Sequence, residues 1–539
     1  MADAVVIGAG PNGLVAANVL ADAGWSVEVL EEQAEPGGAV RSDRGVDPEF
    51  VNDVFSSFYP LAAASPVLAA LRLDKEGLRW SHAPRVLAHP LPDGRCAVID
   101  RDHDAARTAA NLESFAPGDG AAWRELHALW ETVGDALLGC LFTPFPPVRS
   151  AARLAVRVRA AGGLRLARDM MLPVRRLGEE RFDGEGGRLL LAGSALHADL
   201  SPESAIGGGF GWMMSMLAQT HGFPVPVGGA SALTDALVRR LKGRGGLVRC
   251  GERVTQVVVR GGRAVGVRTA TGDAVGARKA VLADVSAPAL FTRLVGAEHL
   301  PEHLLTDMAR RFQWDFSTFK VDWALDGPVP WTSEQAATAG TVHLADSVDD
   351  LTRFGAQIAT RHVPDRPFAL FGQMTTADPS RSPTGTESAW AYTHVPQDIV
   401  ADAGGAGITG AWDRREQEAM ADRIEARVES YAPGFRDRIR GRRVLAPPTL
   451  ESLNANLHRG AINGGTSALH QQLVFRPTPG TGRPETPVTG LYLASSSAHP
   501  GGGVHGAPGA NAARAALRGA LTRGVLGVFQ HRPTPGIYG

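Results

Sequence analysis

Cysteine is scarce in this 539-residue chain, and a long apolar run is missing. The only cysteines, Cys96, Cys140 and Cys250, lie far apart and form no Cys-x-x-Cys pair. This spacing argues against a disulfide framework, a zinc ribbon and a dithiol redox centre, and we expect no metal site. Scattered thiols are typical of a reducing compartment, so we expect a cytoplasmic protein. No apolar run reaches the roughly 18 residues that a membrane span requires, and the N-terminus lacks the basic n-region of a secretory signal.

An excess of charge of either sign is also missing. The chain has 55 Lys and Arg against 56 Asp and Glu, a formal net charge of −1. Nucleic-acid-binding domains are usually clearly basic, so the balance argues against nucleic acid as a partner. The apolar fraction of 44% and the charged fraction of 21% are ordinary for a globular protein. A chain of this length corresponds to roughly three to four domains and can bury large cores.

The beginning of the chain has the pattern of a dinucleotide-binding unit. A short apolar run at residues 4–7 predicts a strand, and residues 8–13 read Gly-Ala-Gly-Pro-Asn-Gly. A helix is predicted over residues 14–23 and a second strand over 25–30, which leads directly into Glu31. Strand, glycine turn, helix, strand and terminal acid in this order are typical of a Rossmann-type nucleotide site.

Each residue of this pattern has a physical role. Gly8 permits the tight turn, Gly10 lets the backbone approach a pyrophosphate, and Gly13 lets the helix pack against the strand. The free N–H groups of the helix N-terminus then face the phosphates. Glu31 is placed to accept hydrogen bonds from the adenosine ribose hydroxyls. Residues 405–410 also match Gly-x-Gly-x-x-Gly, but they follow a loop and precede no strand with a terminal acid, so we expect no second dinucleotide site.

Three further segments extend the pattern. After Glu31, the diglycine Gly37-Gly38 exposes backbone N–H groups and Arg41 adds positive charge, which suits a pyrophosphate. A Pro-x-Gly-Gly segment at 224–230 precedes a predicted helix and a strand that carries Val254. Near the end of the chain, a predicted strand leads through a glycine-rich loop into a helix, and a helix start suits an anion or an electron-rich ring edge. The candidate cofactor residues of this last loop are Gly502, Gly503, Val504, Gly506 and Asn511.

Together these segments resemble the phytoene dehydrogenase (desaturase)-like FAD-dependent oxidoreductases of the amine oxidase/phytoene desaturase superfamily. The loop from His499 to Gly506 matches the closing pattern His-Pro-Gly-x-Gly-x-x-Gly of that family. The resemblance covers nearly the whole chain and implies FAD as the cofactor. It implies that the diglycine and Arg41 hold the flavin side of the pyrophosphate, that the backbone of Val254 meets the adenine, and that the last helix faces the flavin pyrimidine edge.

The resemblance also implies an α/β fold of glutathione reductase/amine oxidase-like architecture. A discontinuous Rossmann-type FAD-binding domain is expected over residues 1–75, 224–300 and 450–520. An α+β substrate domain is expected over residues 76–223 and 301–449, and a C-terminal tail over 521–539.

The implied activity is that of an FAD-dependent dehydrogenase or oxidase. It would take a hydride from a small, apolar metabolite onto flavin N5, form a C=C or C=N bond, and pass electrons to oxygen, a quinone or another carrier. A redox-neutral isomerase, a saturase or an amine oxidase on the same scaffold are alternatives. A non-enzymatic lipid-binding escort such as the Rab GDP-dissociation inhibitors is another, but these lack an intact closing flavin motif.

Two departures from the family concern the substrate. The carotenoid enzymes carry Asp-x-Gly-Pro-Thr near the flavin, whereas the segment around Asp53 lacks Gly-Pro-Thr, which argues against a carotenoid. Amine oxidases place an aromatic pair before the flavin, and no tyrosine lies in the run just before His499, so an aromatic cage built there is not supported.

Histidine supplies the candidates for proton transfer. We predict His458 as the catalytic residue, because it follows Asn454-Ala455-Asn456 in a polar loop that resembles the family's approach to the C-terminal flavin segment. His499, His505, His394 and His221 are the other candidates, and support of loops through hydrogen bonds is the alternative role.

One basic stretch has two interpretations. Residues 149–181 carry nine arginines interleaved with leucine, valine and methionine. The stretch is either a membrane-surface helix that helps a lipophilic substrate to enter, or a lid or surface helix of the substrate domain.

Overall fold

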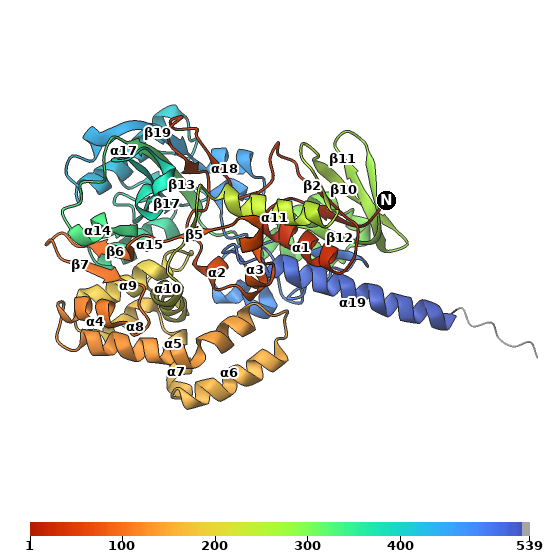
Figure 1. Ribbon diagram of the computed structural model, residues 1–539, viewed down its shortest axis with the longest axis horizontal. Helices are drawn as coiled ribbons and strands as arrows, with labels where there is room; N and C mark the ends of the chain where they lie inside the picture. Colours follow the sequence, from red (N-terminus) through yellow and green to blue (C-terminus); the bar gives the residue numbers. More distant parts are fainter. Residues whose placement is uncertain (531–539) are drawn as a thin grey trace, which may run out of the picture.

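A computed structural model describes residues 1–530, which form two large sheets and a helical region (Figure 1). Of the tail expected over 521–539, residues 521–530 continue the last helix, and 531–539 lie outside the described residues. Within residues 1–530, no helix is both long and apolar enough to cross a bilayer.

The first sheet has seven strands in the order β10-β11-β12-β1-β2-β9, and β20 pairs with β12. Its strands are β1 (Ala2–Ile7), β2 (Val27–Leu30), β9 (Leu247–Arg249), β10 (Val254–Arg260), β11 (Arg263–Thr269), β12 (Ala274–Ala283) and β20 (Leu491–Leu493). β20, β12, β1, β2 and β9 run parallel, whereas β10 and β11 form an antiparallel meander with β12. All of these strands lie inside the ranges 1–75, 224–300 and 450–520.

Helices and the meander cover the two faces of this sheet. On one face, Ala4 and Val6 of β1 pack with helices α1 (Pro11–Asp22), α11 (Ser231–Gly243) and α19 (Ala507–Gln530). On the other face, Val5 and Ile7 pack with residues of β10 to β12 and α13 (Glu302–Arg310). Burial on both faces explains why β1 and β2 are almost wholly apolar rather than alternating.

α1 and α19 come from opposite parts of the sequence and pack against each other. Their approach is close, because a Cβ atom at Gly509 would lie 1.9 Å from the carbonyl oxygen of Asn12. Only glycine fits at that position of α19. In Figure 1, α19 runs outward from this contact, away from the rest of the molecule.

The second sheet has seven strands in the order β19-β13-β17-β16-β14-β6-β7. Its strands are β6 (Arg85–Pro90), β7 (Cys96–Ile99), β13 (Ser317–Leu325), β14 (Ala339–Leu344), β16 (Ala369–Gln373), β17 (Glu387–Val395) and β19 (Ile439–Leu445). Each of them lies inside the ranges 76–223 and 301–449. Two-stranded pairs complete the strand set: β3 (Ser42–Asp43) with β4 (Asn52–Asp53), β5 (Trp80–Ser81) with β8 (Val225–Pro226), and β15 (His362–Val363) with β18 (Ala401–Asp402).

Helices also cover both faces of the second sheet. Phe319, Val321 and Trp323 of β13 pack with α17 (Arg414–Glu429) on the outer face. The opposite face packs with α9 (Glu185–Ala195) and α10 (Gly207–His221) and joins the core of the first sheet. The remaining helices around α9 and α10 are α4 (Ala106–Glu113), α5 (Asp119–Leu141), α6 (Val148–Ala160), α7 (Leu164–Met171) and α8 (Val174–Arg181), which form the lower part of Figure 1. Shorter or peripheral helices are α2 (Pro60–Ala63), α3 (Pro66–Ala70), α12 (Ala287–Ala289), α14 (Glu334–Ala337), α15 (Val348–Ala359), α16 (Met374–Ala377) and α18 (Pro447–Leu453).

The second Gly-x-Gly-x-x-Gly segment, residues 405–410, lies in the loop between β18 and α17. The carboxylate of Asp402 accepts hydrogen bonds from the backbone N–H groups of Ala406 and Ile408, at 2.8 and 3.3 Å. These donors are therefore used within the loop. The strand before this loop, β18, pairs with β15 and not with the first sheet, so the loop lacks the strand setting of the β1–α1 turn.

Candidate active site

A cavity opens at the carboxyl ends of β1 and β2, where parallel sheets of this kind bind their ligands. Its empty volume, part of it open to solvent, is about 1370 Å³. Segments from distant parts of the chain line it. They include Gly8, Gly10, Glu31, Gly38, Val254, Asp284, residues 454–457, Ile462, Gly464, Ser496 and residues 502–504.

The β1–α1 turn forms one wall as the sequence predicts. Gly8 has a φ of +90°, and a Cβ atom at Gly13 would lie 2.2 Å from the carbonyl oxygen of Gly8. Gly13 does not itself line the cavity, because it lies behind Gly10 in the first turn of α1. This close packing presents the N-terminus of α1, with its positive dipole end, to the cavity.

Glu31 is buried at the end of β2 and held by the backbone. Its carboxylate accepts hydrogen bonds from the N–H groups of Ala9, at 2.7 Å, and Gln33, at 3.0 Å. Both bonds hold the carboxylate on the cavity wall. A carboxylate in this position can accept the hydroxyl groups of a ribose.

The diglycine lies against the same turn, but Arg41 has a role that the sequence did not reveal. The N–H of Gly37 donates to the carbonyl of Ala9 at 2.8 Å, and Gly38 reaches the cavity while Gly37 remains behind it. Arg41 does not line the cavity. Its guanidinium donates to the carbonyl oxygens of Gly38, at 3.1 Å, and Leu453, at 2.8 Å. Arg41 therefore links two walls of the site.

The C-terminal loop closes the cavity. Gly502, Gly503 and Val504 line it, and Gly506 packs behind them, where a Cβ atom would lie 2.8 Å from Val15 of α1. Asn511 is 1% exposed, and neither polar atom of its amide has a hydrogen-bond partner among the described residues. A buried amide without a partner is costly, so a hydrogen bond to a bound group would satisfy it.

His458, the predicted catalytic residue, lies beside the cavity rather than on its wall. Its Nδ1 lies 3.0 Å from a carboxylate oxygen of Glu451, and its ring stacks obliquely on Trp314 with centroids 4.8 Å apart. These contacts engage Nδ1 and the ring of the imidazole. The neighbouring residues 454–457, rather than His458, reach the cavity.

The other candidate histidines are uncharged at neutral pH; His394, His499 and His505 are buried and His221 is half-buried. Burial lowers the pKa of His394, His499 and His505 to about 4 and also lowers the pKa of His221. Nδ1 of His505 accepts the N–H of Ala507 at 3.1 Å, so this ring supports the start of α19. The described part of the cavity wall thus contains no histidine.

Asp284 is the cavity residue that the sequence analysis missed. It follows the last residue of β12, and its carboxylate lies between Gly10 and Gly13. Burial, together with the charge of Glu31, raises the pKa of Asp284 to about 7, although the N–H of Gly13 opposes this shift. The sequence offers one signal for it, an acid that directly follows the apolar run of residues 280–283.

A largely buried aromatic surface lies next to the loop of residues 502–504, and its residues are not among those that line the cavity. A Cβ atom at Gly503 would lie 2.5 Å from Leu61, and Phe58, from the same segment, packs against Trp390 of β17 with centroids 6.0 Å apart. Trp390 and Tyr392 stack with centroids 5.9 Å apart and ring planes at 18°. The core of the first sheet thus continues to the inner face of the second sheet.

The residues fit FAD. A glycine turn that no Cβ atom could enter, a helix N-terminus, a carboxylate at the end of β2 and an unpaired buried amide are the partners that pyrophosphate, ribose and a polar ring edge require. Fold and site together define a flavoprotein with one Rossmann-type nucleotide site among the described residues. The sequence profile of the family described as flavin containing amine oxidoreductase matches residues 12–517. The chain belongs to this family, is a flavin-dependent oxidoreductase, and uses FAD.

Relatives from several organisms match along nearly the whole chain. A mouse protein named pyridine nucleotide-disulfide oxidoreductase domain-containing protein 2 is 28% identical over 96% of this chain and 93% of its own. All-trans-zeta-carotene desaturase of Myxococcus xanthus is 27% identical over 93% and 90%. A component of the limonene dehydrogenase of Castellaniella defragrans is 24% identical over 95% and 94%. An oxidoreductase structure from Methanosarcina mazei superposes with a TM-score of 0.61 at 16% identity, covering 96% of this chain and 99% of the other, which shows the shared fold.

Proposed function

We propose that this flavoprotein is a dehydrogenase or oxidase that introduces a C=C bond into a small, apolar metabolite. One C–H bond loses a hydride, the neighbouring C–H bond loses a proton, and the electrons of that second bond form the double bond. Bound FAD supplies the two-electron acceptor at its N5 atom, and oxygen, a quinone or another carrier reoxidises it. The alternative reaction is formation of a C=N bond by the same hydride removal.

The apolar character of the surface beside residues 502–504 carries this proposal. Leu61, Phe58, Trp390 and Tyr392 follow one another from the flavin loop to the inner face of the second sheet. Such a surface binds hydrocarbon by excluding water and offers nothing to fix an ammonium group by charge. Aromatic faces also stabilise a carbocation that hydride loss leaves behind.

Charged groups on the same sheet face neutralise one another. In the register of the sheet, Lys320 lies beside Tyr392, and Asp322 lies beside Trp390. The ammonium of Lys320 contacts the carboxylate of Asp322 and donates to the carbonyl of Asp53 at 2.9 Å. Arg443 adds a second partner to Asp322 at 2.8 Å. Asp322 is thus paired with two cations and is not free to bind a cationic substrate.

Proton removal does not require a strong base. Hydride loss creates a strongly acidic neighbouring C–H group, so positioning does most of the work. His394 lies two residues from Tyr392 on β17, with ring centroids 5.6 Å apart, and is uncharged at neutral pH because burial lowers its pKa to about 4. Its imidazole is the nearest neutral acceptor along this strand.

The relatives support a hydrocarbon substrate. By their names, one acts on a carotene and another on limonene. The missing Gly-Pro-Thr after Asp53 separates this chain from the carotenoid pattern and favours a smaller molecule.

The test is an anaerobic titration of the FAD-loaded protein, in which the visible absorption band of oxidised flavin is followed. Small terpenoid hydrocarbons such as limonene are compared with amines of similar size such as cyclohexylamine, and with NADPH. The proposal expects a hydrocarbon to bleach the band and an alkene product with one more double bond to appear. Bleaching by amines alone would establish C–N oxidation instead, and bleaching by NADPH alone would establish a saturase or isomerase.

A further inference from the structure

The basic stretch that the sequence singled out forms two helices at one edge of the molecule. α6 has no buried residue, and α7 follows it after the glycines Gly162 and Gly163. Leu154 and Val158 of α6 pack inward on the main core, next to α5. Figure 1 shows α6 at the lower edge, with its other side facing solvent.

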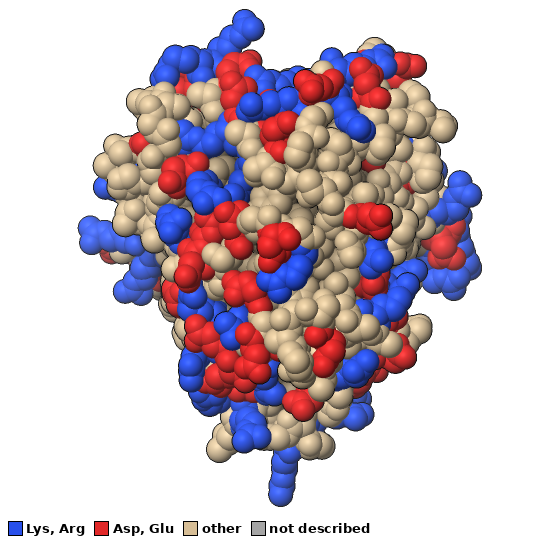
Figure 2. Space-filling model, turned by 90° about the vertical axis from the view of Figure 1, so that its left-hand side faces the viewer, with Lys and Arg blue, Asp and Glu red and all other residues tan. Residues whose placement is uncertain are grey.

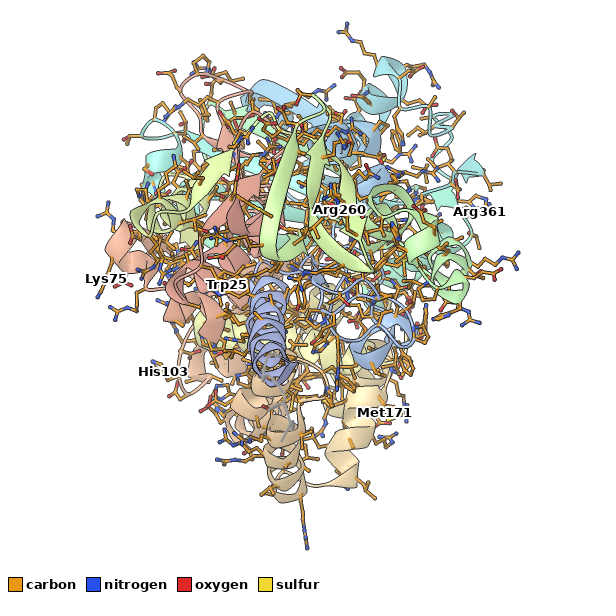
Figure 3. The ribbon with its side chains drawn as sticks, turned by 90° about the vertical axis from the view of Figure 1, so that its right-hand side faces the viewer. Trp25, Lys75, His103, Met171, Arg260 and Arg361 are labelled. Atoms are coloured by element: carbon orange, nitrogen blue, oxygen red, sulfur yellow. The ribbon has the colours of Figure 1, made fainter. Side chains whose placement is uncertain are left out.

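The outward side of these helices exposes aliphatic side chains. Val148 and Val156 are each 70% exposed, Leu164 is 89% exposed, and Met171 is 65% exposed. Eight residues advance a helix by about 80° beyond two full turns, so Val148 and Val156 lie on the broad side of α6 that faces away from Leu154 and Val158. Figure 3 places Met171 at the lower edge as well. Isolated exposed aliphatic residues are ordinary, but four within one short segment mark an interaction surface.

The same segment is strongly basic. No Asp or Glu occurs between Asp135 and Asp169, whereas six arginines do. Arg168 pairs with Glu180 and Asp169. The others form no ion pair with the described residues: Arg149, Arg153, Arg157, Arg159 and Arg165. In Figure 2, Lys and Arg side chains project at the lowest edge of the molecule, while both signs of charge mix higher up.

This surface connects directly to the loop that closes the flavin cavity. The segment between α5 and α6 contains Phe142 and Phe145. The ring centroids of Phe142 and His505 are 5.0 Å apart, and those of Phe145 and His499 are 6.3 Å apart. Both histidines belong to the closing glycine loop. Two aromatic contacts therefore join the segment that precedes α6 to this loop.

We propose that the outward faces of α6 and α7 dock on a membrane whose lipids carry anionic headgroups. The unpaired arginines contact the phosphates, and Val148, Val156 and Leu164 enter the boundary between headgroups and acyl chains, as in other interfacial helices. Given the proposed function, the docked protein draws its apolar substrate from the bilayer through the segment that carries Phe142 and Phe145.

The chemistry of the surface favours lipid over nucleic acid. Single-stranded nucleic acids are bound by arginines together with aromatic side chains on which bases stack. Here the exposed side chains between the arginines are aliphatic. Aliphatic groups stabilise contact with acyl chains and contribute nothing specific to a phosphate backbone.

Flotation of the FAD-loaded protein with vesicles tests the proposal. Vesicles of phosphatidylcholine alone are compared with vesicles that contain about one third phosphatidylglycerol, at low and at 0.5 M salt. We expect the protein to float with the anionic vesicles at low salt, with at least tenfold less bound to the neutral ones and a clear loss at high salt, because salt screens exposed charges.

Three variants sharpen the test. Arg153→Glu with Arg157→Glu removes the charge attraction, and Val156→Asp with Leu164→Asp removes the aliphatic contact; each pair should lower vesicle binding at least tenfold. The matched control is Arg260→Glu with Arg361→Glu, two exposed arginines in the upper half of Figure 3, which should bind as the wild type does. All variants must keep the flavin band and the thermal midpoint, which shows that they fold.

Failure of the wild type to float, equal flotation of the Arg153/Arg157 variant, or retention on a polynucleotide matrix without binding to vesicles would overturn the docking proposal. Vesicle binding does not depend on turnover. Flotation without hydrocarbon oxidation would therefore count against the proposed function alone, and oxidation without flotation against docking alone.

Discussion

The carboxylate of Asp284 accepts a hydrogen bond from the backbone N–H of Gly13, with 2.8 Å between oxygen and nitrogen. An acid from the end of β12 thus lies at the N-terminus of α1, where the helix presents its positive end. The pyrophosphate of FAD requires the same end of the helix. Cofactor and side chain are therefore two anions in one small region.

This proximity predicts that FAD binds best when Asp284 is protonated. Because the pKa of Asp284 is raised to about 7, the neutral acid prevails below that pH and the carboxylate above it. The dissociation constant of FAD should be constant below pH 6 and should rise by up to tenfold per pH unit above pH 7. Quenching of flavin fluorescence on titration with apoprotein measures it. Asp284→Asn, which cannot ionise, should bind FAD with little pH dependence; an unchanged pH dependence in this variant would assign the titration to another group.

Gly13→Ala should abolish FAD binding. The added methyl group would lie 2.2 Å from the carbonyl oxygen of Gly8 and 3.1 Å from the carboxylate of Asp284, so α1 and the turn cannot both keep their positions. We expect a protein without flavin colour and destabilised by roughly 1–3 kcal/mol, the usual cost of overpacking. The matched control is Gly243→Ala at the end of α11, where a Cβ atom meets nothing within 4 Å. This control should keep its flavin, and a colourless control would show that the assay reports general instability.

Arg41 should act through its shape rather than its charge. Its guanidinium bridges the carbonyl oxygens of Gly38 and Leu453, and a single ammonium group does not reproduce that fork. Arg41→Lys and Arg41→Ala should therefore weaken FAD binding to a similar extent, by about tenfold, since a lost hydrogen bond of this kind costs roughly 1–1.5 kcal/mol. Equilibrium dialysis measures the dissociation constant of FAD for each variant and so distinguishes an effect of shape from an effect of charge. Full rescue by lysine would show that Arg41 serves the pyrophosphate by charge after all.

Trp390 and His458 should differ sharply in their effect on turnover. Trp390→Ala removes the middle of the aromatic surface and should lower kcat/KM at least tenfold, mainly through KM, with the substrate found by flavin bleaching. His458→Ala removes a ring that contacts Glu451 and Trp314 beside the cavity and should change kcat less than about twofold. Flavin content serves as the folding control for both. A large loss of kcat in the His458 variant, together with a changed pH dependence of kcat, would identify His458 as the proton-transfer residue.

The nucleotide unit could be predicted because its pattern lies within neighbouring residues. Contacts between distant segments could not be predicted from the sequence. The strand at 4–7, the glycine turn and the helix at 14–23 agree with β1 and α1 to within a few residues, because turn and periodicity are determined locally. The position of Asp284 depends on the parallel pairing of β12 with β1, which no short pattern encodes. The same holds for Arg41, whose partner Leu453 is brought near by folding alone.

The aromatic surface was missed for a related reason. The segment just before His499 carries no aromatic pair, whereas the stack of Trp390 and Tyr392 comes from β17 of the other sheet. Alternation along this strand places both rings on one side, but which face of the sheet meets the flavin domain is a property of the whole fold.

The contact between α1 and α19 bears on how the protein is made. α1 is synthesised early, whereas α19, the helix that covers its apolar side, is translated long afterwards. Until Gly509 and Asn511 are in place, the nascent chain exposes this side and lacks one wall of its flavin site. We therefore expect FAD to bind only after α19 has been translated, and a chain that lacks α19 to bind no flavin and to aggregate or be degraded.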